Sequence, residues 1–212
     1  MSHVVSKQDW ASIDINTQTG LVFVQEDWFY TWESIDPAHP LWSIQEKRSF
    51  QHAVDQQIWK TWSNHIRLRV AGASDFARHF AHDGVKVNFD TRWVLARGNW
   101  RVRAVKVAPD DPVFRREAVD PANRVILLYT SGLKPYNARN DVGAVGPGFH
   151  PNPHEFGHTM RNPDEYGHAS PNLPDTGSIM NVGKALRARH LQLLIDTLNR
   201  MMPQNNFQPW IT

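Results

Sequence analysis

Cysteine is absent from this chain of 212 residues. Its absence excludes a disulfide framework, a thiolate nucleophile, an iron–sulfur cluster and any cysteine-based zinc site. A strong charge imbalance is also absent, because 23 Lys and Arg residues stand against 21 Asp and Glu residues. Histidine and tryptophan, by contrast, are abundant, with 11 and 9 residues. A transition-metal site in this chain must therefore use nitrogen and oxygen ligands.

Long apolar runs are missing as well. No stretch of 18 apolar residues exists, so we expect no membrane span. Residues 1–25 include Asp9 and Asp14, where a signal peptide would need an unbroken apolar stretch. We therefore expect a chain that is synthesised in the cytoplasm without a signal peptide.

Basic residues gather in one segment only, between residues 92 and 106, where no acidic residue occurs. Trp100 and Val102 alternate there with Arg101, which is typical of a strand with one solvated face. A short alternating strand in a nearly neutral chain is a weak nucleic-acid signal. We therefore expect no nucleic-acid partner.

The apolar pattern predicts an α+β fold in a single domain over residues 1–212. Phe50, Val54, Ile58 and Trp62 recur at four-residue spacing and predict a core-facing helix over 46–63. A short helix is expected at 74–81 and a final helix at 184–201. Strands are expected at 20–25, 66–70, 85–89, 93–96, 100–107 and 124–130. Apart from the strand at 20–25, we expect residues 1–45 to form an irregular N-terminal segment rich in Pro and Trp. A sheet-rich half is expected over residues 46–150.

Residues 154–158 read His-Glu-Phe-Gly-His, the HExxH pattern. On a helix, His154 and His158 lie one turn apart on the same face, so both imidazoles can bind one metal ion. Glu155 then lies beside the ion and can accept a proton from metal-bound water. Asn152 and Pro153 suit the N-cap and the first helical position, with Glu155 in the capping-box position, so we expect this helix over about 152–161.

Two histidines are not enough, because catalytic zinc normally takes three protein ligands. Pro163 disfavours helical geometry at Asn162, and Asn tolerates the left-handed conformation of a sharp turn. The helix should therefore stop near Asn162, and Asp164 is placed to return to the metal. Glu165 and His168 are the alternative third ligands, since carboxylate and imidazole both bind zinc.

The run from His154 to Asp164 resembles the metzincin pattern HExxHxxGxxH, in the variant with an Asp third ligand found in snapalysin-like proteases. Ser178-Ile-Met-Asn181 resembles the metzincin Met-turn, with Met180 below the metal. The longer series of motifs over residues 154–190, HEFGH, NPDEY, SIMN and RARH, is also similar to bacterial metallopeptidase domains associated with toxins and contractile secretion systems. The resemblance covers about residues 124–200. It departs at Arg161, where the pattern has Gly, and Asn162 is the residue expected to make the turn instead.

This resemblance implies a zinc-dependent endopeptidase with a twisted mixed sheet of about five strands, a backing helix, a catalytic helix and a C-terminal helix. Residues 151–212 would be the catalytic half, with a cleft between its helix and the sheet edge. His154, His158 and Asp164 would bind Zn²⁺, and Glu155 would be the general base. The main candidates for stabilising the oxyanion are Tyr166 and His190. His168 and Arg187 are further candidates, and His150 is a weaker one.

The resemblance also implies a biological setting. An uninhibited protease would threaten its own host cell, so we expect a bacterial toxin or effector that is exported by a specialised secretion or injection system. Its partners would be a protein or peptide substrate, an immunity or inhibitor protein, and the secretion apparatus. The alternatives are a non-catalytic zinc-containing binding module of a larger assembly, and an amidase that acts on cell-wall peptide.

Overall fold

The computed structural model describes residues 2–113 and 115–211. Within these residues the fold is mixed α+β, with a large sheet and four α-helices, as expected. The strands are β1 (His3–Lys7), β2 (Ser12–Asn16), β3 (Leu21–Ser34), β4 (Ile66–Gly72), β5 (Val85–Val94), β6 (Trp100–Lys106), β7 (Ala118–Asp120), β8 (Val125–Tyr129), β9 (Tyr136–Arg139), β10 (Val145–Phe149) and β11 (Asn205–Ile211). The helices are α1 (Ile44–Trp62), α2 (Asp75–Phe80), α3 (Pro151–Thr159) and α4 (Gln192–Met201), with 3-10 turns η1 (Thr130–Leu133) and η2 (Ala188–Leu191). None of the helices in the described part of the chain is long and apolar enough to cross a membrane.

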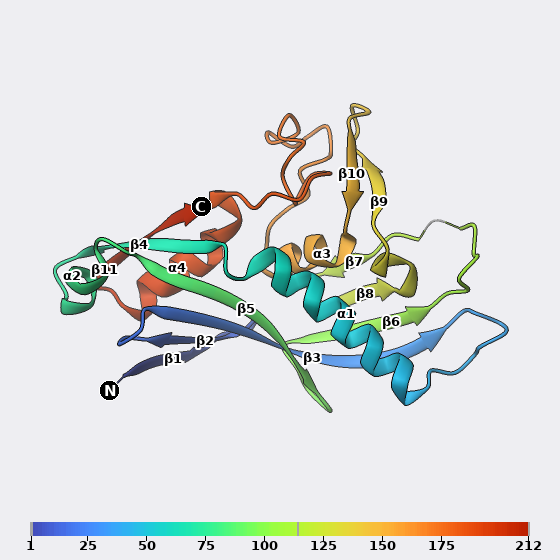
Figure 1. Cartoon of the computed structure of the whole chain (residues 1–212), viewed down its shortest axis with the longest axis horizontal. Helices are drawn as coiled ribbons and strands as arrows, with labels where there is room; N and C mark the ends of the chain where they lie inside the picture. Colours follow the sequence, from blue (N-terminus) through green and yellow to red (C-terminus); the bar gives the residue numbers. More distant parts are fainter. Residues whose placement is uncertain (1, 114, 212) are drawn as a thin grey trace.

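Strand β3 lies at the centre of the main sheet (Figure 1). It runs parallel to β5 on one side, and on the other side it pairs first with β2 and then with β6. The strand order is β11-β4-β5-β3-β6-β8-β7, with β1 paired to β2. Strand β7 pairs with β8 alone among the described strands and so forms an edge, close to helix α3. A separate antiparallel hairpin, β9–β10, stands beside α3 (Figure 1).

The expectation of an irregular N-terminal segment over residues 1–45 is wrong. Strands β1, β2 and β3 occupy most of it, and Trp28 and Trp32 belong to the central strand rather than to an overlying loop. The acidic residues within β3 interrupt the alternation of apolar and polar residues that would indicate a strand. In the fold, Glu26 accepts a hydrogen bond from the Trp28 indole, and Asp27 pairs with Arg92. Satisfied in this way, they continue a strand whose alternate residues are buried from position 22 to position 30.

The sheet is also larger than the five strands expected, with nine strands in the described residues. The predicted strands 85–89 and 93–96 are the single strand β5, and β11 was not foreseen. Helix α1 is confirmed but begins earlier than residue 46, because Ser43 and Glu46 form a capping box that starts the helix at Ile44. The final helix over 184–201 is shorter than expected, with η2 preceding α4.

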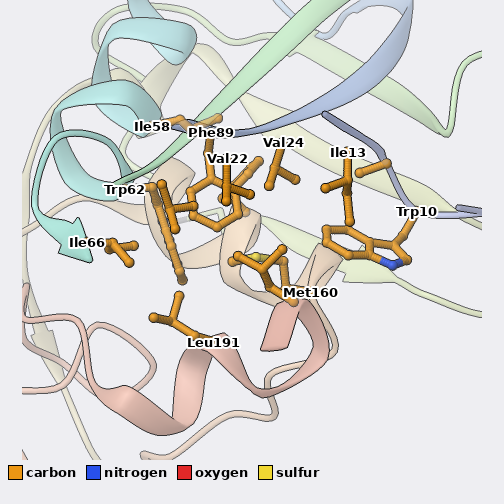
Figure 2. Close-up of a cluster of buried hydrophobic side chains, with 14 of the residues drawn as sticks. Trp10, Ile13, Val22, Val24, Ile58, Trp62, Ile66, Phe89, Met160 and Leu191 are labelled. Carbon is orange, nitrogen blue, oxygen red and sulfur yellow. The ribbon is translucent and has the colours of Figure 1, made fainter. Parts of the chain in front are cut away.

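The core lies between the sheet, helix α1 and the C-terminal segments (Figure 2). Trp62, at the end of α1, is fully buried and packs edge-on against Phe89 of β5 and Phe156 of α3. Its indole N–H donates to the carbonyl of Pro153, at 2.9 Å. One side chain therefore joins the backing helix, the sheet and the start of α3, which places α3 on the sheet.

Candidate metal centre and its cleft

Helix α3 carries both histidines of the HExxH pattern. The helix begins at Pro151, with His150 in the cap position and no side-chain capping bond, so the expected N-cap Asn152 and the capping box of Glu155 are wrong. Asn152 is buried within the first turn instead and donates to the Gln57 side chain of α1. This hydrogen bond joins the first turn of α3 to α1 and fixes the start of α3 in place of a capping bond.

Gly157 allows the Met180 side chain to lie directly against α3. A Cβ atom at position 157 would be 2.3 Å from the Met180 Sδ atom. Met180 is fully buried, and the carbonyl of its neighbour Ile179 accepts from Nδ1 of His154 at 2.7 Å. The segment over 178–181 thus supports α3 from below and orients the first histidine.

Three ligand atoms converge at one point. His154 Nε2 is 3.2 Å from His158 Nε2, and these two nitrogens are 3.1 and 3.2 Å from Asp164 Oδ1. Zinc ligands at about 2.0–2.1 Å from the ion in tetrahedral geometry lie about 3.3 Å from one another. The spacing of these three atoms therefore fits one central ion, and the group can hold a metal.

Hydrogen bonds on the outer ring nitrogens orient this triangle of ligand atoms. Nδ1 of His154 donates to Ile179, and Nδ1 of His158 donates to the carbonyl of Asn162 at 2.7 Å. These bonds direct both Nε2 atoms toward each other and toward Asp164. A cation at the centre of the triangle would bind all three atoms at once. Backbone carbonyls on the outer nitrogens are also how metal-binding histidines are usually oriented.

The chain turns after α3 at Arg161, not at Asn162 as expected. Arg161 adopts a φ of 64°, the left-handed conformation that Gly would occupy without strain. Asn162 has a different role: its side-chain amide donates to the carbonyls of Gly157 and His190. These bonds close the turn and return Asp164 to the two histidines.

Asp164 is held from both sides. Partial burial alone would raise its pKa, but hydrogen bonds with His154, His158 and Tyr166 outweigh burial and lower the pKa well below the usual range. The Tyr166 hydroxyl donates to the second carboxylate oxygen of Asp164, and its ring stacks near His154. Asp164 therefore stays ionised, as a ligand must, and Tyr166 orients it.

Glu155 lies beside the ligand group. It is 5% exposed, and its Oε2 atom has no hydrogen-bond partner among the described residues. Burial raises the pKa of this carboxyl, although His154 and His158 partly oppose the shift. A buried carboxyl with a free oxygen next to a metal-binding group has the position and the basicity that a general base needs.

Two hollows meet at Glu155 and form the cleft. The first, of about 490 Å³, includes His154, and the second, of about 560 Å³, includes His158 and Asp164. Both are lined by Arg116, Glu117, Glu155 and Tyr166. The cleft thus extends to both sides of the ligand group.

Arg116 and Glu117 were missed by sequence reasoning. Glu117 is 3% exposed and lies against Gly132, where an added Cβ would be 2.0 Å from Glu117 Oε1. The guanidinium of Arg116 stacks over the ring of Tyr166 at 4.5 Å. These residues have no fixed sequence spacing to the HExxH pattern. They lie just before the edge strand β7 and come close to α3 only in the fold.

The other sequence candidates lie elsewhere. Glu165 is buried and pairs with Arg189. His168 is exposed, and its backbone N–H donates to Asp141. Neither belongs to the group of described residues that can hold a metal.

His190 is 1% exposed, and both of its ring nitrogens are engaged, Nε2 with Ser178 and Nδ1 with the backbone N–H of Arg187. Burial lowers the pKa of His190 to about 4. Arg187 itself pairs with Asp175. His150 is half-buried in front of α3, and neither it nor His190 lines either hollow. His190 and Arg187 therefore stabilise the segment below the site.

No family model, curated protein or solved structure matches the chain. The case for a function therefore depends on the ligand triangle, Glu155 and the cleft themselves.

Proposed function

We propose that this chain is a zinc-dependent endopeptidase of metzincin-like type. The observation that carries the proposal is the convergence of His154, His158 and Asp164 to separations of 3.1–3.2 Å, with Glu155 beside them. Nitrogen and oxygen ligands with one adjacent acid are the donor set of catalytic zinc rather than of a closed structural site. The support of α3 by Met180 is a second point of similarity to metzincins.

The bound zinc ion would polarise the scissile carbonyl and acidify a water molecule. Glu155 would accept the proton of that water through its unpartnered Oε2 and pass it to the leaving amine. The Tyr166 hydroxyl orients Asp164, and because Tyr166 lines both hollows its side chain would also contact a bound substrate. Space on both sides of Glu155 suits a peptide that continues past the cleaved bond in both directions, which favours an endopeptidase.

Export as a bacterial toxin or effector, with an immunity or inhibitor protein as partner, remains part of this proposal. It depends on the resemblance of residues 154–190 to secretion-associated metallopeptidases, and the folded chain adds no argument for it. A direct check is to express the chain in a bacterial cytoplasm with and without the Glu155→Gln substitution. Growth arrest by the wild type alone is expected of a toxin, and equal growth would refute this part.

Metal content tests the site. The purified protein should bind one zinc ion per chain, Asp164→Ala should lose at least tenfold in zinc affinity, and the exposed control His168→Ala should keep the wild-type affinity. Loss of zinc in His168→Ala but not in Asp164→Ala would mean that the third ligand is wrong. Absence of stoichiometric zinc in the wild type would refute the metal centre.

Peptide cleavage tests the chemistry. Glu155→Gln keeps the shape of the side chain and should retain zinc while losing about 10²–10⁴-fold in turnover of a denatured protein substrate. Equal turnover by wild type and variant would exclude Glu155 as the base. Zinc binding without any hydrolysis would instead favour the binding module, and hydrolysis of cell-wall peptide alone would favour the amidase.

A further inference from the structure

Residues of the β9–β10 hairpin line one part of the hollow on the His154 side. The hairpin itself stands beside α3 (Figure 1). Tyr136 and Arg139 of β9, Phe149 of β10 and the segment 181–182 line the hollow together with Arg116 and Glu155. The rings of Tyr136 and Phe149 meet edge-on at 5.4 Å and give the hollow an apolar wall. A side chain that entered this hollow would have both apolar and charged surroundings.

Two guanidinium groups in the hollow are held in place but not neutralised. Arg139 donates from Nη1 to the carbonyl of Gly143 across the hairpin turn, at 3.0 Å, and Arg116 stacks on Tyr166. Neither forms an ion pair with any carboxylate in the described part of the chain. Arg115, by contrast, donates to Asp111 at 2.7 Å.

The acids of this hollow do not cancel these charges. Burial and the negative charge of Glu155 raise the pKa of Glu117 to about 7, so Glu117 carries only part of a charge at neutral pH. Asp164 lines the other hollow and is occupied by the two histidines. Glu155 also lines the hollow beside His154 and carries at most one negative charge, so the two guanidinium groups of Arg116 and Arg139 leave an excess of positive charge there.

We propose that this hollow is a substrate subsite that binds a carboxylate group between Arg116 and Arg139. The carboxylate can belong to an acidic side chain near the cleaved bond or to the chain terminus of the substrate. Guanidinium groups bind carboxylates through paired, charge-assisted hydrogen bonds. Arg139 is oriented by its bond to Gly143 and Arg116 by its contact with the Tyr166 ring, and both contacts leave N–H donors for a ligand. The inference rests on the proposed function, because it assigns the substrate class of the same cleft.

Peptide selection tests the subsite without requiring turnover. Zinc-loaded Glu155→Gln protein is immobilised and exposed to randomised dodecapeptides, one set with amidated and one with free C-termini. Retained and input peptides are compared by mass spectrometry. Enrichment of Asp and Glu in the amidated set assigns an acidic side chain, and enrichment of the free-acid set over the amidated set assigns the chain terminus. Both outcomes support a carboxylate subsite.

Substitutions then assign the enrichment to residues. Removing the guanidinium in Arg139→Ala, in the Glu155→Gln background, should weaken binding of the selected peptide about tenfold. Arg139→Glu should shift the selection toward Lys and Arg. Arg48→Ala removes the same charge from the exposed face of α1 and should leave the selection unchanged. Retention of no peptide, retention without carboxylate enrichment, or equal enrichment in Arg139→Ala would overturn the proposal.

Failure of the subsite and failure of the proposed function are distinguishable. Carboxylate-dependent retention by the variant without any hydrolysis by the zinc-loaded wild type would refute the peptidase and keep the subsite. Hydrolysis by the wild type with no preference for carboxylates would keep the peptidase and refute the subsite. Arg116 and Arg139 are both exposed, so thermal unfolding of their variants should match that of Arg48→Ala and confirm that they fold.

Discussion

Replacing Gly157 with Ala should have opposite effects on stability depending on the residue at position 180. The added Cβ would be 2.3 Å from Met180 Sδ, more than an ångström inside ordinary contact distance. Met180 is fully buried, so neighbouring atoms must move with it. Overpacking of this kind costs about 1–3 kcal/mol. Ala is about 1 kcal/mol better than Gly in a helix, which offsets part of that cost.

The same substitution should stabilise the protein once Met180 is also replaced by Ala. The clash with Met180 is then gone, and the remaining approach to Trp62 Cζ2 at 3.3 Å can relax into the space that Met180 leaves. The helix preference of Ala remains, so Gly157→Ala should add up to about 1 kcal/mol to the free energy of unfolding. Met180→Ala by itself should cost about 2–5 kcal/mol through the cavity that it leaves. The coupling energy between positions 157 and 180 is therefore expected at about 1–3 kcal/mol.

Urea unfolding of the four proteins in metal-free buffer measures this cycle, since bound zinc would otherwise add its own stabilisation. Zinc affinity is the second readout: displacement of Met180 also displaces the Ile179 carbonyl, whose bond fixes the His154 ring. The Gly157→Ala variant should lose about tenfold or more in zinc affinity. An equal effect of Gly157→Ala on stability in both backgrounds would refute the close contact and the argument built on it.

Three further predictions follow from single positions. Arg161→Gly should stabilise the fold by about 1 kcal/mol in urea unfolding, because Gly adopts the φ of 64° without strain, and destabilisation would contradict a left-handed turn there. Burial raises the pKa of Glu26 to about 8, so wild-type stability should fall, relative to Glu26→Gln, as the pH rises from about 4.5 to about 8. The difference should reach a few kcal/mol above pH 8 and be small below about pH 4.5, and a pH-independent difference in thermal unfolding would exclude a protonated Glu26. Zinc at 100-fold above its dissociation constant should add about 2.7 kcal/mol to the stability of the wild type, whereas a chelator should remove this gain and His158→Ala should show none.

Local patterns in the chain are sufficient to predict some elements. Helix α1 is confirmed because four apolar residues at four-residue spacing define a buried face whatever it packs against. His154 and His158 are likewise paired by helix periodicity alone. Only the first part of β3 was predicted, as a strand over 20–25. Its continuation could not be identified in this way, because the buried Glu26 has its hydrogen-bond partners in Thr159 of α3 and the Trp28 indole. A partner 133 positions away along the chain leaves no local signal.

The third ligand shows where such patterns end. Asp164, Glu165 and His168 were all open as ligands, and the folded chain brings Asp164 to the histidines while Glu165 pairs with Arg189 on the other side. Adjacent residues point in different directions after a turn, so one strained backbone angle at Arg161 decides between them. The spacing of residues along the sequence does not predict that backbone angle.

The sequence by itself determined the type of chemistry available: with no cysteine and a His-Glu-x-x-His helix, a metal site had to be built from nitrogen and oxygen. Tertiary structure alone decided which carboxylate completes the ligand group and which residues form the cleft around it. Arg116, Glu117 and Arg139 come from a segment before the edge strand and from a separate hairpin, and they meet α3 only in the folded chain. The physical reason is that helix periodicity acts within a few residues, whereas the cleft depends on long-range packing.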